Sequence, residues 1–179
     1  MITLVAIIAG IGVVIGARLF TADNARTRRV LRRARVVPIA ELVDGQLACI
    51  VGTIEADGEP LVSMMSRTRC VAFDTSTSSL DGNLVSTKVT RHAVAFFVVD
   101  KTGRARIDAP QIALCNKPTL RSDRFEERVL EVGATVRLVG SVSLDPTIAT
   151  HSEHTYRAGQ FTATLSGTVK YPLLADTER

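Results

Sequence analysis

The chain has 179 residues, is 46% hydrophobic and carries a formal net charge of +4 at pH 7. It has no tryptophan and only 4% aromatic residues, so its core must be built mainly from Val, Ile, Leu and Ala. The positive charge lies at the N-terminus, because residues 36–179 hold 15 Lys plus Arg against 17 Asp plus Glu, a net −2. This balance disfavours nucleic acid as a ligand of the larger part of the chain.

The first twenty residues, MITLVAIIAGIGVVIGARLF, are apolar on every side of a helix, and Arg18 is their first charged residue. About 20 helical residues span the roughly 30 Å of a bilayer's hydrocarbon core. No Lys or Arg precedes the apolar run and no clear A-x-A cleavage site follows it, which disfavours a cleaved signal peptide. The sequence therefore predicts a transmembrane helix over residues 1–20. Gly12 and Gly16 form a G-x-x-x-G spacing, so a homodimer through this helix is a further hypothesis.

A basic juxtamembrane segment over residues 21–37 follows and includes the run RTRRVLRRAR. On a helical wheel Val30 and Leu31 lie on one side, and the arginines occupy the other half. Positive flanks stay on the cytoplasmic side, which predicts a single-pass membrane protein with its N-terminus out and its C-terminal domain in the cytoplasm. No aromatic residue interleaves with the arginines, so anionic headgroups of a lipid bilayer are favoured over nucleic acid. The predicted membrane-surface residues are Arg26, Arg28, Arg29, Arg32, Arg33 and Arg35.

Residues 38–179 read as a mainly β domain. β-Branched runs predict strands at 46–56, 66–76, 134–144 and within 161–174, and turn residues at 57–60, 81–83 and Thr102-Gly103 separate the strands. The segment 122–133 predicts one short helix, because Phe125, Val129 and Val132 fall on one face and Gly133 follows them. Several strands with one short helix predict a small closed β-barrel of OB type. Glycines inside strand patterns are expected where barrel strands bend: Gly52, Gly140 and Gly167.

Residues with chemical potential are few. Cys49, Cys70 and Cys115 include no C-x-x-C pair, and we expect buried thiols in a reducing compartment. Arg67 and Arg69 precede Cys70 in sequence, but strand alternation points the arginines and the thiol to opposite faces. A reactive thiol is therefore disfavoured.

The histidines and Ser66 do not predict a catalytic or metal site. His151 and His154 form an H-x-x-H in a polar segment that predicts a solvated loop and no metal. His92 is expected to be an exposed edge residue. Ser66 has no G-x-S-x-G context, so no nucleophile is predicted there. The sequence thus predicts no catalytic residue, no cofactor and no metal.

Several pieces of the chain, in order, resemble the GIDE (beside-a-membrane) domain of membrane-anchored mitochondrial E3 ubiquitin ligases and their prokaryotic relatives. They are GTI at 52–54, PLVSMMSRTRCVAF at 60–73, FFVVDKTGRARID at 96–108, ERVLEVGATVRLVGSV at 127–142 and YPLL at 171–174. The resemblance implies a β-rich domain held at a membrane face to recruit a partner. The ligases also carry a zinc-binding RING, whereas the Cys and His residues here have no RING spacing, so ubiquitin transfer is not implied.

Three classes of function follow from these observations. The favoured class is a non-enzymatic, single-pass membrane protein whose cytoplasmic domain binds an unknown protein partner. The second is an E3 ubiquitin ligase-like component without the RING. The third is an OB-fold nucleic-acid binder, which requires exposed stacking aromatics. The phenylalanines lie in apolar runs suited to a core: Phe73, Phe96, Phe97, Phe125 and Phe161.

Overall fold

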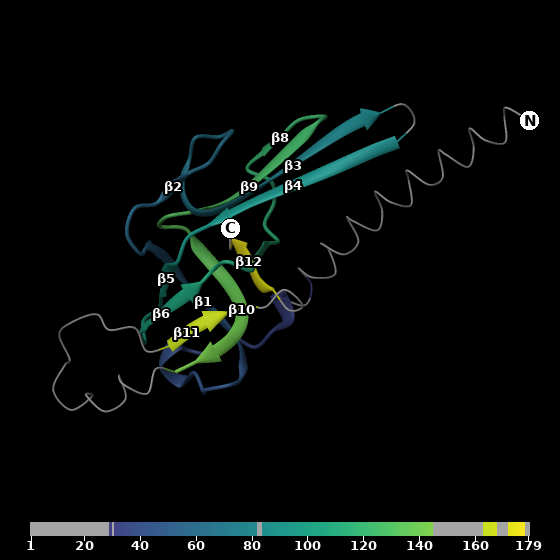
Figure 1. Cartoon of the computed structure of the whole chain (residues 1–179). Helices are drawn as coiled ribbons and strands as arrows, with labels where there is room; N and C mark the ends of the chain where they lie inside the picture. The colour runs from purple at the N-terminus through teal and green to yellow at the C-terminus, as the bar shows by residue number, and fades with distance from the viewer. Residues whose placement is uncertain (1–28, 30, 82–83, 145–162, 168–171, 178–179) are drawn as a thin grey trace, which may run out of the picture.

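Figure 1 presents a computed structural model of the chain, which describes residues 29, 31–81, 84–144, 163–167 and 172–177. Over these residues twelve strands form two sheets. Helical residues at 29 and 31–33 and a 3-10 turn, η1 (Ile39–Glu41), precede the first strand. The predicted mainly β fold with a small barrel is confirmed. In this part of the chain no helix has the length and apolarity to cross a membrane. The predicted helix at 1–20, with Gly12 and Gly16, lies outside the described residues.

Five strands form a closed ring. β1 pairs antiparallel with β5, β5 with β6, and β10 with both β11 and β1, while β6 and β11 run parallel. Two further strands, β12 and β7, extend the sheet from β10. The strands of this sheet are β1 (Leu47–Ala56), β5 (Phe96–Val99), β6 (Arg104–Asp108), β7 (Ile112–Leu114), β10 (Thr135–Ser143), β11 (Ala163–Ser166) and β12 (Leu173–Thr177).

Aliphatic side chains fill the ring, as the composition requires. Buried and exposed residues alternate along β10, so Val136, Leu138 and Val142 point inward. They join Ile54 of β1 and Phe96 of β5, which is wholly buried, in one continuous core cluster. The barrel is therefore a packed core rather than a channel.

Gly52 lies where β1 passes close to β5. A Cβ at this position would overlap the carbonyl oxygen of Val99 and come within 2.8 Å of Val98 Cγ1. The glycine therefore permits a close approach between two barrel strands.

The second sheet consists of two insertions into the barrel. β2 (Leu61–Val62), β3 (Arg69–Asp81) and β4 (Leu84–Ala93) lie between β1 and β5 in the chain. β8 (Leu120–Arg121) and β9 (Phe125–Glu131) lie between β6 and β10. β3 pairs with β9 on one side and with β4 on the other, and the β3–β4 hairpin extends beyond the barrel (Figure 1). The pairing of Asp81 with Leu84 confirms the predicted hairpin.

The short helix predicted over 122–133 is wrong, because residues Phe125–Glu131 form strand β9. Phe125 and Val129, four residues apart, suit one face of a helix, but they equally occupy alternate positions of a strand. The intervening position on that strand face is Glu127, a buried carboxylate that interrupts the apolar alternation. Pairing with β3 decided the conformation of this segment.

Substitution Gly52→Ala is expected to destabilise the fold by about 1–3 kcal/mol, because the new methyl group overlaps backbone atoms of β5. Denaturation with urea, followed by circular dichroism, measures the change. Thr53→Ala, at the exposed neighbouring position of β1, is the matched control and should stay within about 0.5 kcal/mol of the wild type. Equal stabilities of the two variants would contradict the close approach.

Candidate functional site

The C-terminal end of the arginine-rich segment is attached to the barrel. Leu31 is wholly buried, whereas the arginines beside it are exposed. The Val37 N–H donates a hydrogen bond of 2.8 Å to the carbonyl oxygen of Cys49 on β1. Arg137 of β10 donates to the carbonyl oxygen of Ala34 at 3.4 Å. The segment therefore continues the packed surface of the domain.

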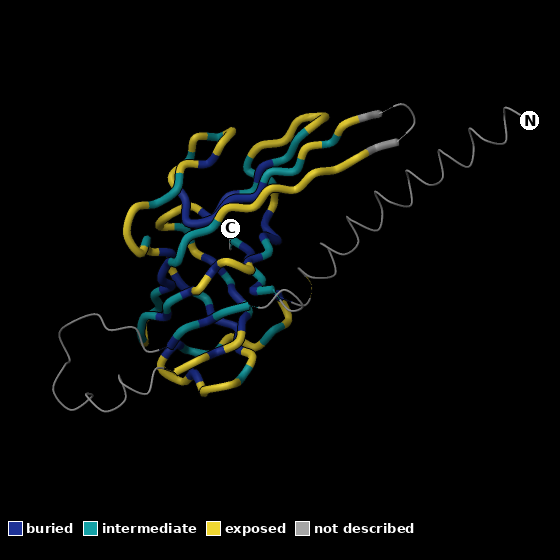
Figure 2. Tube along the Cα trace, viewed as in Figure 1, coloured by how far each residue is buried: buried dark blue, intermediate teal, exposed yellow. Residues whose placement is uncertain are grey.

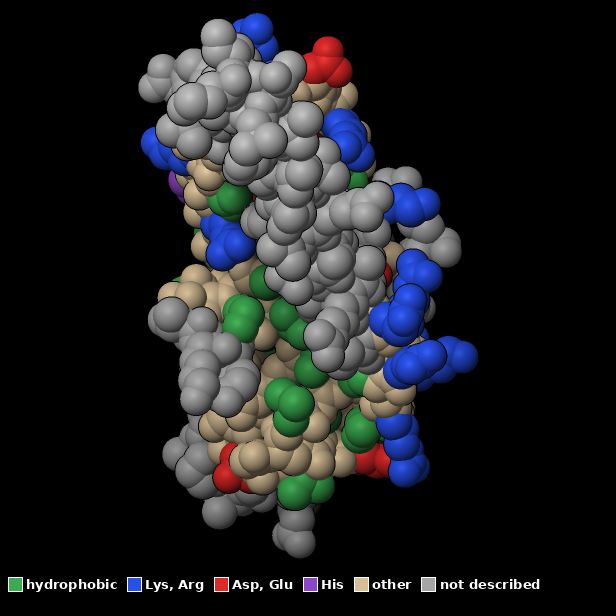
Figure 3. All heavy atoms as spheres, turned by 90° about the vertical axis from the view of Figure 1, so that its right-hand side faces the viewer, with side chains coloured by type: hydrophobic (Ala, Val, Ile, Leu, Met, Phe, Trp, Pro, Cys, Tyr) green, Lys and Arg blue, Asp and Glu red, His purple; other side chains and the backbone are tan. Residues whose placement is uncertain are grey.

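The predicted membrane-surface residues that the structure describes are Arg29, Arg32, Arg33 and Arg35, and all four are exposed. Arg26 and Arg28 lie outside the described residues. Arg32 forms a long ion pair of 4.0 Å with Asp176, but its side chain remains 72% exposed, so this contact is weak. Figure 3 shows Lys and Arg side chains gathered along one edge of the face that it displays.

Asp100 connects the β5–β6 turn to η1. Its Oδ1 accepts hydrogen bonds from the N–H groups of Thr102 and Gly103, which confirms these residues as turn formers. Its Oδ2 accepts the Ile39 N–H at 3.0 Å, and Thr102 Oγ1 accepts the Ala40 N–H. Burial alone would raise the pKa of Asp100, but these hydrogen bonds outweigh it and lower the pKa. The β5–β6 turn is thus held together by Asp100 and is also hydrogen-bonded to η1.

Glu127 of β9 organises the loop between β2 and β3. Its two carboxylate oxygens accept the N–H groups of Met65 and Ser66, each at 2.8 Å. Burial of this wholly enclosed side chain favours a higher pKa, but hydrogen bonds from Ser66, Met65 and Ser63 lower it. The loop includes Arg67 at a φ of 57°, a left-handed conformation that these contacts stabilise. Ser66 is therefore part of a structural network.

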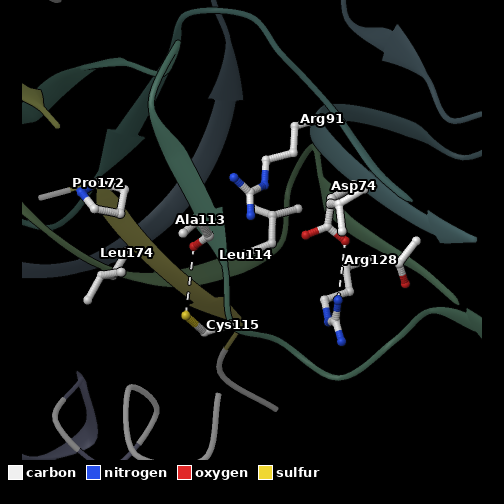
Figure 4. Close-up of a pocket in the computed structure, with 10 residues that line it drawn as sticks. Asp74, Arg91, Ala113, Leu114, Cys115, Arg128, Pro172 and Leu174 are labelled. Carbon is white, nitrogen blue, oxygen red and sulfur yellow. Dashed lines mark hydrogen bonds and ion pairs between the residues drawn. The ribbon is translucent and has the colours of Figure 1, made fainter. Parts of the chain in front are cut away.

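A cleft of about 200 Å³ opens between the second sheet and strands β7 and β12. Asp74 is buried in it and forms an ion pair of 3.4 Å with Arg128, which also binds Glu126 at 2.9 Å. Burial raises the pKa of Asp74, although Arg128 and Arg91 act in the opposite direction. Figure 4 shows Arg91 reaching over Leu114 towards Ala113. The lining residues are Asp74, Ser76, Val89, Arg91, Ala113, Leu114, Cys115, Arg128, Pro172 and Leu174.

The sequence reasoning missed this cleft and the Glu127 network. A single signal was present for each: Asp74 follows a run of apolar strand residues, and Glu127 occupies an inward position of β9. Neither signal identifies its partners, since Asp74 and Arg128 are 54 positions apart and meet only because β3 pairs with β9.

The expected burial of the cysteines is confirmed. Cys49, Cys70 and Cys115 are all buried and form no disulfide. Burial, with the charge of Glu127 adding to it, raises the pKa of Cys70 to about 11, so this thiol stays protonated at neutral pH. Arg69 is exposed on the other side of the strand.

Of the three histidines, His92 lies within the described residues. His92 is exposed on β4 and stacks on Phe73 with 4.9 Å between ring centroids. His151 and His154 lie outside the described residues. Among the residues that the structure does describe, no group of three or more His, Cys, Asp or Glu side chains could hold a metal ion.

Comparisons of the chain with family models, with curated proteins and with solved structures give no match.

Substitution Leu31→Ala is expected to destabilise the domain by about 2–3 kcal/mol, because it removes a wholly buried side chain at the junction with the arginine-rich segment. Thermal or urea denaturation provides the measurement. Leu47→Ala makes the same chemical change at a residue that is 74% exposed and should have little effect. A similar loss in both variants would show that the segment does not pack as described.

Substitution Glu127→Gln is expected to cost about 2–3 kcal/mol at pH 7, because an amide cannot replace a carboxylate that accepts several hydrogen bonds. The folded-state pKa of Glu127 lies below its ordinary value of 4.5. The carboxylate therefore stabilises the fold above pH 4.5, and this contribution is lost as the pH falls through the folded-state pKa.

The difference in unfolding free energy between wild type and Glu127→Gln should accordingly shrink below pH 4.5, as measured by denaturation at pH 7 and at decreasing pH. Glu131→Gln, an exposed change on the same strand, should show a small difference at every pH. A Glu127→Gln effect that does not depend on pH would contradict the role of the charge.

Proposed function

We propose that this chain is a single-pass membrane protein whose cytoplasmic domain, a GIDE-like barrel of OB type, binds a protein partner at the membrane face. The single observation that carries the proposal is the attachment of the arginine-rich segment to the barrel through the hydrogen bonds of Val37 with Cys49 and of Arg137 with Ala34. The five-stranded closed ring supports the OB-type assignment.

The exposed arginines give the domain a fixed basic surface next to the predicted anchor. Each basic residue near an anionic leaflet contributes about 1 kcal/mol, within a Debye length of about 8 Å at physiological salt. Arg29, Arg32, Arg33 and Arg35 belong to a segment that is hydrogen-bonded to the barrel. Attraction of these arginines to lipid headgroups therefore orients the whole barrel relative to the membrane.

The alternatives receive less support from the described residues. A nucleic-acid-binding OB fold needs exposed aromatic rings, but Phe73, Phe96 and Phe97 are at most 8% exposed and Phe125 is half-buried. An enzyme that uses a thiol nucleophile needs a lowered pKa, whereas that of Cys70 is raised. Both observations favour a binding module.

Changing the six arginines Arg26, Arg28, Arg29, Arg32, Arg33 and Arg35 to Gln is expected to place the C-terminus outside in part of the population, because the positive flank that sets orientation is removed. Protease accessibility of the C-terminus in intact cells measures this. Binding of the peptide 21–37 to anionic vesicles should also fall with added salt and with the same substitutions, while binding to neutral vesicles changes little.

The matched control removes the same number of charges elsewhere on the exposed surface: Arg67, Arg69, Lys101, Lys117, Arg121 and Arg124 to Gln. This variant should keep the wild-type orientation. A wild-type C-terminus that is accessible from outside, or a peptide that binds neutral and anionic vesicles equally, would overturn the proposal.

A further inference from the structure

Strand β4 is an open edge of the second sheet. It is ten residues long and pairs with β3 alone among the described strands. Its register with β3 is continuous from Ala72↔Ala93 to Asp81↔Leu84, with no bulge and no proline. Figure 2 shows the strand exposed over most of its length, and residues 86–92 are all exposed. Long regular edges of this kind can pair with a further strand.

The backbone groups available on this edge follow from the pairing. Ser78 of β3 donates its N–H to Arg124, on the β9 side, so Ser78 and its β4 partner Thr87 form a non-hydrogen-bonded pair. Alternation along the ladder then directs the N–H and C=O groups of Thr87, Val89 and Arg91 away from β3. The intervening residues of β4 direct theirs towards it. The outward residues of this edge, which include Thr87, Val89 and Arg91, thus follow one another at a spacing of two.

The side chains of the same three residues lie on the cleft face of the sheet. Val89 and Arg91 both line the cleft, opposite Leu114 and Leu174. In Figure 4 the Arg91 guanidinium lies beside the apolar wall of β7. Asp74 is already paired with Arg128, and within the described part of the chain Arg91 forms no hydrogen bond or ion pair. Its donors are therefore available to a ligand at the edge.

The charge of β4 selects the chemistry of that ligand. The strand sequence LVSTKVTRHA holds Lys88, Arg91 and His92 and no acidic residue. A second copy of β4 would place like charges side by side, which is unfavourable. An extended segment with acidic side chains would instead form charge-assisted hydrogen bonds with Arg91.

We propose that the β4 edge binds an extended acidic segment of a protein partner by strand addition, with an acidic side chain at Arg91 and an apolar side chain beside Val89 in the cleft. The inference rests on the proposed function, since it names the docking edge and the partner chemistry of the module. Main-chain hydrogen bonds to Thr87, Val89 and Arg91 supply affinity, and the cleft supplies side-chain specificity.

The test uses the full chain in nanodiscs of neutral phosphatidylcholine and the labelled peptide Thr-Glu-Thr-Val-Thr-Glu-Thr. This palindrome presents Glu, Val and Glu on one face in either strand direction. Fluorescence anisotropy should show saturable binding that weakens about tenfold when Gln replaces both Glu residues of the peptide. Arg91→Gln should weaken binding by a similar factor. Lys88→Gln, the same loss of charge on the opposite face of β4, should change it less than twofold.

Amide hydrogen exchange provides a readout that general electrostatic attraction does not produce. Bound peptide should slow exchange at Thr87, Val89 and Arg91, while Ser86, Lys88 and Thr90, already bonded to β3, change little. Val89→Pro removes an outward N–H without removing a bond to β3 and should abolish binding.

Equal effects of Arg91→Gln and Lys88→Gln, or uniform exchange along β4, would overturn the inference. A dimer in sedimentation that Val89→Pro dissociates would also overturn it, in favour of a second copy. The variant in which the six N-terminal arginines are changed to Gln should bind the peptide with the affinity of the wild type. Peptide binding and membrane orientation can therefore fail separately.

Discussion

The pairing of β1 with β10 closes the barrel over seven residue pairs, from Leu47↔Ser141 to Thr53↔Thr135. These strands lie about 90 residues apart in the chain, and the segment between them contains the ring strands β5 and β6 as well as the two insertions that leave the ring. The two insertions meet outside it through the pairing of β3 with β9, and they form the second sheet. The cleft exists because this second sheet stands against β7 and β12. The positions of the cleft and of the edge strand therefore both depend on how the second sheet is formed.

Three carboxylates add polar contacts to those of the apolar core. Asp100 fixes η1, Glu127 fixes the loop before β3, and Asp74 pairs with Arg128 under the second sheet. The first two have a lowered pKa because several donors surround them, whereas burial dominates at Asp74 and raises its pKa. A carboxylate that accepts several backbone N–H groups orders irregular backbone beside the apolar core.

The proposed membrane contact and the proposed partner contact occupy different elements of one packed domain. The arginines precede β1, and the open edge lies on the β3–β4 hairpin that extends away from the barrel (Figure 1). A partner strand at β4 adds main-chain hydrogen bonds without disturbing the ring, because β4 contributes only to the second sheet. The two proposed contacts therefore require no rearrangement of the core.

The sequence by itself determined the mainly β class, the strands at 46–56 and 134–144, the hairpins and the burial of the cysteines, because alternation, turn residues and apolar runs are local signals. The helical periodicity of the sequence also placed Leu31, which is buried, on the side opposite the exposed arginines. The spacing of Phe125, Val129 and Val132 predicted a helix, but this segment is a strand. Glu127 occupies the inward position between Phe125 and Val129, and this charged residue hides the alternation of apolar residues that is typical of a strand. Only the tertiary structure decided that β9 is a strand, that Asp74 meets Arg128 and that β4 is an edge. These are pairings between distant segments, and no local pattern specifies which strands become neighbours.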